Sequence, residues 1–212
     1  MAWFSLLSRR KMALLCACLL AGLVLCGTVQ AVRWSRTQLD TGALLCADTL
    51  RLHIRADSDA VADQSAKLRV RDAILRVLDE RCPAAEEAAA RRWVVQQFPA
   101  LQFAALRTLE ELGMRVPVRI WLVNMYFDTT RYAAAALPAG RYDALRIDIG
   151  ADARYGKNWW CVLYPGLCRD MCTGYALPQE NDLVCGEYLL RFRLVEWWQR
   201  RTQSRADLPL VG

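Results

Sequence analysis

The stretch LRLHIR, residues 50–55, decides the fold, because apolar and polar residues alternate along it. Alternation with a period of two is typical of a β-strand that has one face in the core and the other toward solvent. Asp57, Ser58 and Asp59 follow, and they supply an N-cap and acidic groups for the start of a helix. The sequence therefore predicts a half-buried strand that leads into a helix.

Apolar residues at helical spacing predict three helical segments after this strand. The first runs from residue 59 to about Arg81 and ends at Pro83. The second covers residues 84–97 and is interrupted at Pro99, after which the helix resumes. It ends at Gly113, because glycine is the usual residue just past the end of a helix.

Further alternating runs predict strands at residues 116–127 and 144–149, and the LPAG sequence at 137–140 predicts a turn before the second of them. This order of elements predicts an α+β domain with a small, mostly antiparallel sheet and helices packed on one face. Residues 188–201 predict one more strand that runs into a short amphipathic helix. For Trp197 and Trp198 in this helix, core packing is favoured over an Arg/Trp surface that touches a membrane.

An uncharged run precedes the domain, from Met12 to Val32, and it is long enough to cross a membrane. Three basic residues on its N-terminal side place that end in the cytoplasm and the rest of the chain outside. Cleavage after Ala31 is an alternative, but the run is long for a signal peptide, so an uncleaved anchor is favoured. The predicted organisation is a cytoplasmic N-terminus at 1–11, a signal anchor or signal peptide at 12–32, a linker at 33–48, an extracytoplasmic domain at 49–200 and a tail at 201–212.

Composition excludes several functional classes. The 212 residues carry a net charge of +6, which is too mild to indicate nucleic-acid binding. With one histidine, the chain cannot form a metal site that needs two imidazoles. We therefore expect no metal and no other cofactor, no nucleic-acid partner and no small-molecule substrate.

Nine cysteines fall into two groups by position. Cys16, Cys18 and Cys26 lie in the apolar run and count as small apolar residues. The remaining six are predicted to form disulfides in an oxidising compartment, with the connectivity left open; they are Cys46, Cys82, Cys161, Cys168, Cys172 and Cys185. Cys161 and Cys168 form the favoured pair, because their short separation along the chain suits one bridge.

The sequence GKNWWC, residues 156–161, is the most unusual in the chain. Gly156 and Asn158 suit a tight turn, and paired tryptophans usually belong to a core. With Lys157 and Asn158 beside them, Trp159 and Trp160 would alternatively mark an exposed recognition loop.

A catalytic interpretation has to use His53. This histidine would act as the base for Cys161 as a thiol nucleophile, oriented by Asp57 or Asp59, in an extracytoplasmic thiol-dependent hydrolase. A lone histidine in a strand is more often structural, and an extracytoplasmic cysteine is more often oxidised. We therefore predict that the protein is not an enzyme and keep the hydrolase as the alternative.

Several segments together resemble the stage II sporulation protein R family. They are LHIRADSD at 52–59, DQ at 63–64, KLRVRD at 67–72, LPAGRYDALRIDIG at 137–150, GKNWWCVLYPGLC at 156–168 and RFRLVEWW at 191–198. The chain departs from the family pattern at Asp57, where asparagine is usual, and at Asp128 and Gly166, where proline is usual.

The resemblance implies a signalling protein that is made in the forespore and exported into the space between the two septal membranes. There it would activate a membrane-embedded aspartic protease of the mother cell, which removes the pro-sequence of the mother-cell sigma factor. A structural protein of the septum is a weaker alternative. The residues expected to contact the partner or to shape the contacting loop are His53, Asp59, Lys157, Asn158, Trp159 and Trp160.

Overall fold

The computed structural model describes seven parts of the chain. They are residues 9–79, 86–132, 135–150, 158–165, 178–185, 193–203 and 207–211. The chain consists of two compact units, Met1–Thr41 and Gly42–Gly212.

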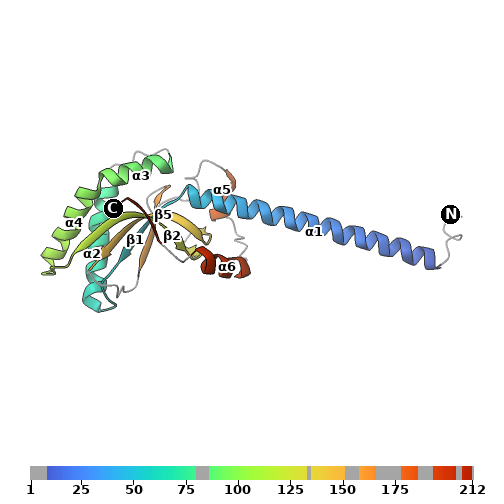
Figure 1. Ribbon diagram of the computed structural model, residues 1–212, viewed down its shortest axis with the longest axis horizontal. Coiled ribbons are helices and arrows are strands. Elements are labelled where there is room, and N and C mark those ends of the chain that lie inside the picture. Colours follow the sequence, from blue (N-terminus) through green and yellow to red (C-terminus); the bar gives the residue numbers. More distant parts are fainter. Residues whose placement is uncertain are drawn as a thin grey trace. The chain divides into compact units, whose positions relative to one another are not determined.

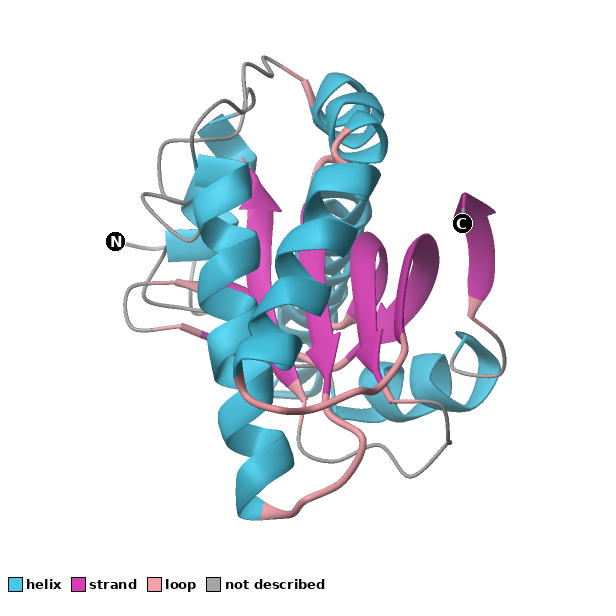
Figure 2. Cartoon of the chain, turned by 90° about the vertical axis from the view of Figure 1, so that its left-hand side faces the viewer, coloured by secondary structure: helices cyan, strands magenta, loops and turns pink. Residues whose placement is uncertain are grey.

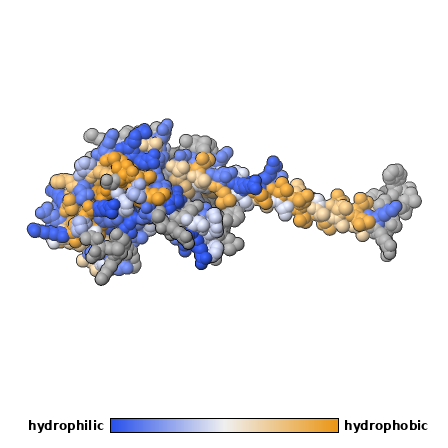
Figure 3. Space-filling view, viewed as in Figure 1, coloured by the Kyte–Doolittle hydropathy of each residue, from blue (hydrophilic) through white to orange (hydrophobic). Residues whose placement is uncertain are grey.

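The first unit consists of most of α1 (Arg9–Ala47), a continuous helix of 39 residues. Among the described residues, this helix is long and apolar enough to cross a membrane, and its apolar part is not buried against protein. Figure 3 shows the apolar side chains along it. The segment 33–48, predicted as a linker without clear periodicity, is helical as far as Ala47. No proline interrupts it, and Leu45 in the last turn is fully buried in the second unit.

The second unit is built on a mixed five-stranded sheet in the order β6-β1-β5-β2-β7. Its strands are β1 (Leu50–Arg55), β2 (Val118–Phe127), β5 (Gly140–Ile149), β6 (Trp159–Tyr164) and β7 (Leu208–Val211). The pair β1–β5 is parallel and the three other pairs are antiparallel. A separate two-stranded sheet joins β3 (Thr130–Arg131) and β4 (Ala136–Leu137).

Helices α2 (Val61–Asp79), α3 (Glu87–Gln96) and α4 (Phe98–Glu111) cover one face of the sheet, as Figures 1 and 2 show. Their apolar residues pack on Leu50, Leu52 and Ile54 of β1 and on the matching residues of β2 and β5. The predicted α+β fold, with a mostly antiparallel sheet and helices on one face, is confirmed. Two short helices follow β6, namely α5 (Pro178–Cys185) and α6 (Arg193–Gln203).

The break between α3 and α4 lies at Gln97, two residues before the interruption predicted at Pro99. Pro99 sits in the first turn of α4, where its missing N–H leaves no intrahelical hydrogen bond unmade. Gly113 ends this helix with a positive φ of 71°, as predicted. The N–H of Met114 donates to the carbonyl of Leu109 at 2.9 Å and closes the helix end.

Two predictions about the end of the chain were wrong. The predicted tail contains β7, which pairs with β2, so it belongs to the domain. Trp197 and Trp198 on α6 are 54% and 59% exposed, so they are not core residues. The helix is held instead by polar contacts, in which Arg200 donates to Asp128 and Thr129 donates to Glu196. Most of the strand predicted before α6 lies outside the described residues.

Candidate functional site

The sheet face opposite α2, α3 and α4 carries the polar side chains of β1. Arg51, His53 and Arg55 point to this face because Leu50, Leu52 and Ile54 point to the other. The alternation predicted a face toward solvent, but Arg51 is fully buried and His53 is 2% exposed. A second apolar cluster, which includes Leu45 from the last turn of α1, Leu137 from β4 and Val184 from α5, covers part of this face.

Strand register lines up four side chains across this face, one from each of four strands. Trp160 of β6 pairs with His53 of β1, which pairs with Arg146 of β5, which pairs with Trp121 of β2. We call these four residues the central row. Directly paired residues of neighbouring strands point to the same face, so a histidine and an arginine lie side by side in this row with a tryptophan at each end.

His53 is enclosed by aromatic rings. Its imidazole stacks on Trp160, with ring centroids 4.0 Å apart and planes 6° from parallel, and it meets the ring of Phe127 edge-on. Neither ring nitrogen has a hydrogen bond of ordinary geometry among the described residues. Burial, together with the nearby charge of Arg146, lowers the pKa of His53 to about 3, although the amide of Asn158 opposes this shift. The histidine is therefore neutral at physiological pH.

Arg51 lies two residues before His53 on β1 and points to the same face of the sheet, where aromatic rings cover its guanidinium. Its central carbon lies 3.9 Å from the ring centroid of Phe127 and 5.0 Å from that of Tyr142. One terminal nitrogen donates to the hydroxyls of Thr130 and Tyr132 at 3.1 and 3.0 Å. Through these contacts a buried arginine links β1 to the β3–β4 sheet.

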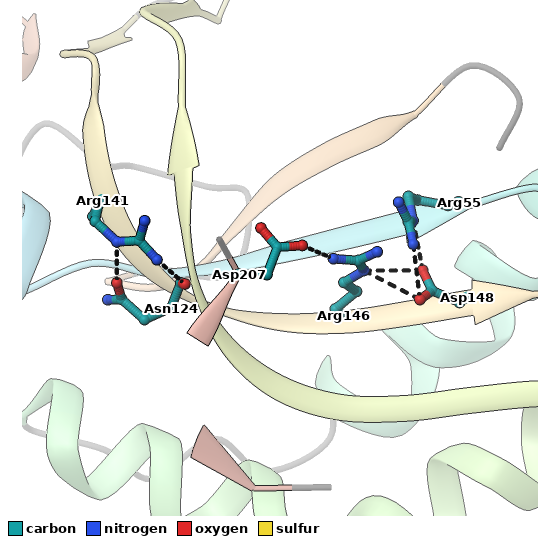
Figure 4. A network of polar contacts seen from close by, with 6 residues as sticks. All are labelled: Arg55, Asn124, Arg141, Arg146, Asp148 and Asp207. Atoms are coloured by element: carbon teal, nitrogen blue, oxygen red, sulfur yellow. Dashed lines mark hydrogen bonds and ion pairs between the residues drawn. The ribbon is translucent and has the colours of Figure 1, made fainter. Parts of the chain in front are cut away.

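A chain of ion pairs crosses the same face (Figure 4). Arg55 binds both carboxylate oxygens of Asp148, at 2.7 and 3.0 Å. Arg146 binds the same carboxylate at 3.1 Å and also the carboxylate of Asp207, which precedes β7. Burial raises the pKa of Asp148, while Arg146 opposes that rise. The network therefore connects the middle of the sheet to its β7 edge.

A second network joins β2 and β5. Arg141 donates to the side-chain oxygen of Asn124 at 2.7 Å (Figure 4). Asn124 in turn donates to Asp143 at 2.7 Å. Asp143 also accepts from Arg91 of α3 at 2.6 Å. These contacts fix the position of α3 on the sheet.

The tryptophan pair lies on the edge strand β6, where Trp159 packs against one apolar cluster and Trp160 against the other, in the manner of the favoured core packing and not of an exposed loop. Trp160 faces the central row, and Trp159 faces the opposite, helix-covered side, with the guanidinium of Arg71 5.3 Å from its ring centroid. Both are half-buried, and Asn158 before them is exposed. A doubled tryptophan conceals alternation, because both faces of the strand then carry the same residue. Asp59 is exposed in the loop after β1, and Lys157 lies outside the described residues.

The hypothesised thiol–imidazole pair does not form. Cys161 pairs in register with Leu52 and His53 with Trp160, so Cys161 and His53 point to opposite faces of the sheet. Cys161 is also disulfide-bonded. Its favoured partner Cys168 lies outside the described residues, so this pairing stays a prediction.

The prediction that all six outer cysteines are bridged was wrong for Cys46, which is free. Its thiol packs against Gly140, where an added Cβ would lie 2.6 Å from the sulfur. Cys82 and Cys172 lie outside the described residues, and of Cys185 only the helical backbone is described. Within the described part of the chain, no cluster of three or more His, Cys, Asp or Glu side chains is arranged to hold a metal ion.

Sequence reasoning missed Arg146, Asp148, Trp121 and Asp207 as site residues. The first three were visible as outward positions of predicted strands, where polar residues are ordinarily solvated. The contact of Arg146 with Asp207, 61 residues later, has no local signal in the sequence.

Comparison with known proteins identifies the domain. Residues 46–173 match the family Stage II sporulation protein R. The chain belongs to this family. Stage II sporulation protein R of Bacillus subtilis (strain 168) is 34% identical over 137 residues, which is 63% of this chain and 59% of the relative's length. No solved structure matches the chain significantly.

The part that matches the stage II sporulation protein R family contains the sheet from β1 to β6 and the three helices on its face. It therefore includes His53, Arg146, Trp121 and Trp160, the whole central row. Helix α6 and strand β7, with Asp207, lie beyond it.

Proposed function

We propose that this chain is an exported signalling protein that activates a membrane-embedded protease of the mother cell, which then cleaves the pro-sequence of the mother-cell sigma factor. Membership of the stage II sporulation protein R family is the observation that carries this proposal. The apolar helix α1 supports it, because a signal anchor or signal peptide of this kind would send the domain across the forespore membrane.

The chemistry of the domain supports a binding role over a catalytic one. His53 is neutral, buried and stacked on Trp160, and it faces away from Cys161, whose sulfur is already in a disulfide. A disulfide sulfur is not a thiolate nucleophile. The central row therefore acts as a rigid support for the β6 edge of the domain.

Contact with the protease would involve the exposed residues around this edge. Asn158 is exposed and Trp159 is half-buried. The stack of Trp160 on His53 attaches β6 to β1. Asp59 lies in the exposed loop that follows β1, the neighbour of β6. Binding energy from this surface would shift the protease toward its active state in proportion to the difference in affinity for the two states.

Coexpression of the full chain with the protease and the sigma precursor tests the proposal, with cleavage followed by the size of the sigma factor. Processing is expected with the native chain and with Cys161→Ser if that variant remains folded. Asn158→Ala and Trp159→Ala are expected to reduce processing, while Trp197→Ala on helix α6 serves as the matched control. Unchanged processing when the chain is omitted would refute the function, and equal processing by all variants would refute only the contact surface.

Localisation is tested separately by mass spectrometry of the protein recovered from sporulating cells. An intact N-terminus would establish an anchor, and a chain that begins at Val32 would establish cleavage after Ala31. Recovery of the domain from the forespore cytoplasm alone would contradict export.

A further inference from the structure

Strand β7 occupies the outer edge of β2 but contributes little to the core. All four of its residues are exposed, with Leu208, Leu210 and Val211 at 53%, 42% and 45%. Its pairing with the ten-residue β2 involves Leu122, Val123 and Asn124, with an irregularity in the middle. Pro209, which pairs with Val123, has no N–H to donate to the sheet.

An ion pair supplies the specific part of this attachment. Asp207 contacts Arg146, whose side chain is 6% exposed, while the aspartate itself is 38% exposed. The same guanidinium lies 4.9 Å from the ring centroid of Trp121 on β2. At this edge of the sheet, Arg146 therefore binds a carboxylate, and β2 pairs with the backbone of an extended segment that carries apolar side chains.

We propose that the β2 edge is a docking site for an extended segment of a partner protein, in which a carboxylate precedes apolar residues, and that β7 occupies this site as a displaceable intramolecular strand. The occupant's chemistry is deduced from Asp207–Val211, the segment that the structure places there. Addition of a strand to a sheet edge is a general mode of peptide recognition, in which backbone hydrogen bonds give affinity and side chains give specificity.

The weak burial of β7 makes displacement feasible. A strand with few buried apolar groups opens at the low end of the range of local stabilities. The ion pair is partly exposed, so exchanging Asp207 for an equivalent carboxylate costs little. Strand β5, by contrast, is paired on both sides and is buried along most of its length. The proposal concerns the β2 edge and does not depend on the protease as the partner.

Binding of a fluorescent peptide with the sequence of residues 206–212 to the full chain provides the test. Asp207→Asn in the chain should weaken its own β7 and raise the apparent affinity for the peptide at least fivefold. A peptide with asparagine in place of aspartate should bind about tenfold more weakly, since one charge-assisted contact is lost. Glu111→Gln, which removes an exposed carboxylate of α4, is the matched control and should change nothing.

Amide hydrogen exchange on the native chain gives an independent measurement. Amides of Leu208, Leu210 and Val211 should exchange at least tenfold faster than those of β5. Equal protection of the two strands, or peptide affinity that is the same for native and Asp207→Asn chains, would overturn the proposal. Dimerisation of the Asp207→Asn chain without added peptide would also overturn it, because the occupant would then be a second copy.

Discussion

The rings of His53 and Trp160 stack across the β1–β6 pair with their centroids 4.0 Å apart. Phe127 of β2 contacts both rings edge-on, at centroid distances of 6.2 and 4.8 Å. Three strands thus meet at one buried imidazole whose nitrogens have no hydrogen bond of ordinary geometry among the described residues. This arrangement tolerates the neutral ring and strongly opposes its protonation.

Stability should therefore fall as the solution is acidified. The pKa of His53 is about 3 in the folded protein and 6.5 in an unfolded chain, so the unfolded state binds more protons between these values. The contribution of the neutral, buried His53 to the free energy of unfolding is complete above pH 6.5 and is lost as the pH falls toward 3. Between pH 7.5 and 5.5 the free energy of unfolding should decrease by about 1 kcal/mol, measured by urea denaturation.

His53→Phe is the control for this effect, since it keeps an aromatic ring on Trp160 and removes the titration. Burial raises the pKa of Asp148 and Glu87, so these groups add stability as the pH falls, in the opposite direction. Because both proteins share them, the difference between the two pH profiles isolates the histidine. Parallel profiles would show that His53 does not titrate in this way.

Gly150→Ala should destabilise the domain severely. Gly150 has a φ of +101°, and an added Cβ would lie 2.6 Å from the Cβ of Asp57 and closer still to its carboxylate. Strain and steric overlap together should cost about 3 kcal/mol or more. Gly113→Ala is the matched control, because its φ is +71° but nothing lies within 4 Å of the added atom. Its cost should be about 1 kcal/mol, and equal losses in thermal denaturation would contradict the role of Asp57.

The exposed and the half-buried tryptophans should respond differently to truncation. Trp197→Ala and Trp198→Ala remove side chains that are more than half exposed, so the free energy of unfolding should change by about 0.5 kcal/mol or less. Trp160→Ala removes the stack with His53 and the contact with Phe127 and should cost about 3 kcal/mol. Similar losses for all three in urea denaturation would show that α6 is packed more tightly than the structure has it.

Peptide mapping without reduction should find Cys161 in a bridge and Cys46 as a free thiol. The bridged partner is predicted to be Cys168. Cys46 should react with an alkylating agent slowly in the native protein and rapidly in urea, because it packs against Gly140. A bridge to Cys46, or a reduced Cys161 in protein isolated under non-reducing conditions, would contradict this assignment.

The sequence predicts the elements of this fold well and the burial of its second face poorly. Strands at 50–55, 116–127 and 144–149 and the helix after β1 all follow from local periodicity, which depends on residues a few positions apart. The polar residues of β1 looked solvated because alternation reports which residues share a face and not what covers it. Arg51 is buried by Phe127 and Tyr142, which lie more than 70 residues away along the chain.

The candidate site shows the same division. His53, Trp159 and Trp160 stood out by residue type, and the structure places His53 and Trp160 in one stack. Strand register determines which of the remaining residues meet. Trp160 pairs with His53, and Cys161, the next residue, points to the opposite face of the sheet. The attachment of β7 to β2 was missed because a short strand that contains proline and is followed by few residues resembles a tail.

The place of β1 in the sheet has a consequence for how the chain acquires its structure. β1 leaves the ribosome first among the strands, yet its neighbours β5 and β6 are made much later, and Arg55 and Asp148 are 93 residues apart. The β2–β5 pair joins strands close in sequence, so we expect it to form early; β1 then adds to the free edge of β5, and β6 adds to β1. The stack of His53 on Trp160 therefore forms last, because Trp160 belongs to β6, the last of the three strands to be made.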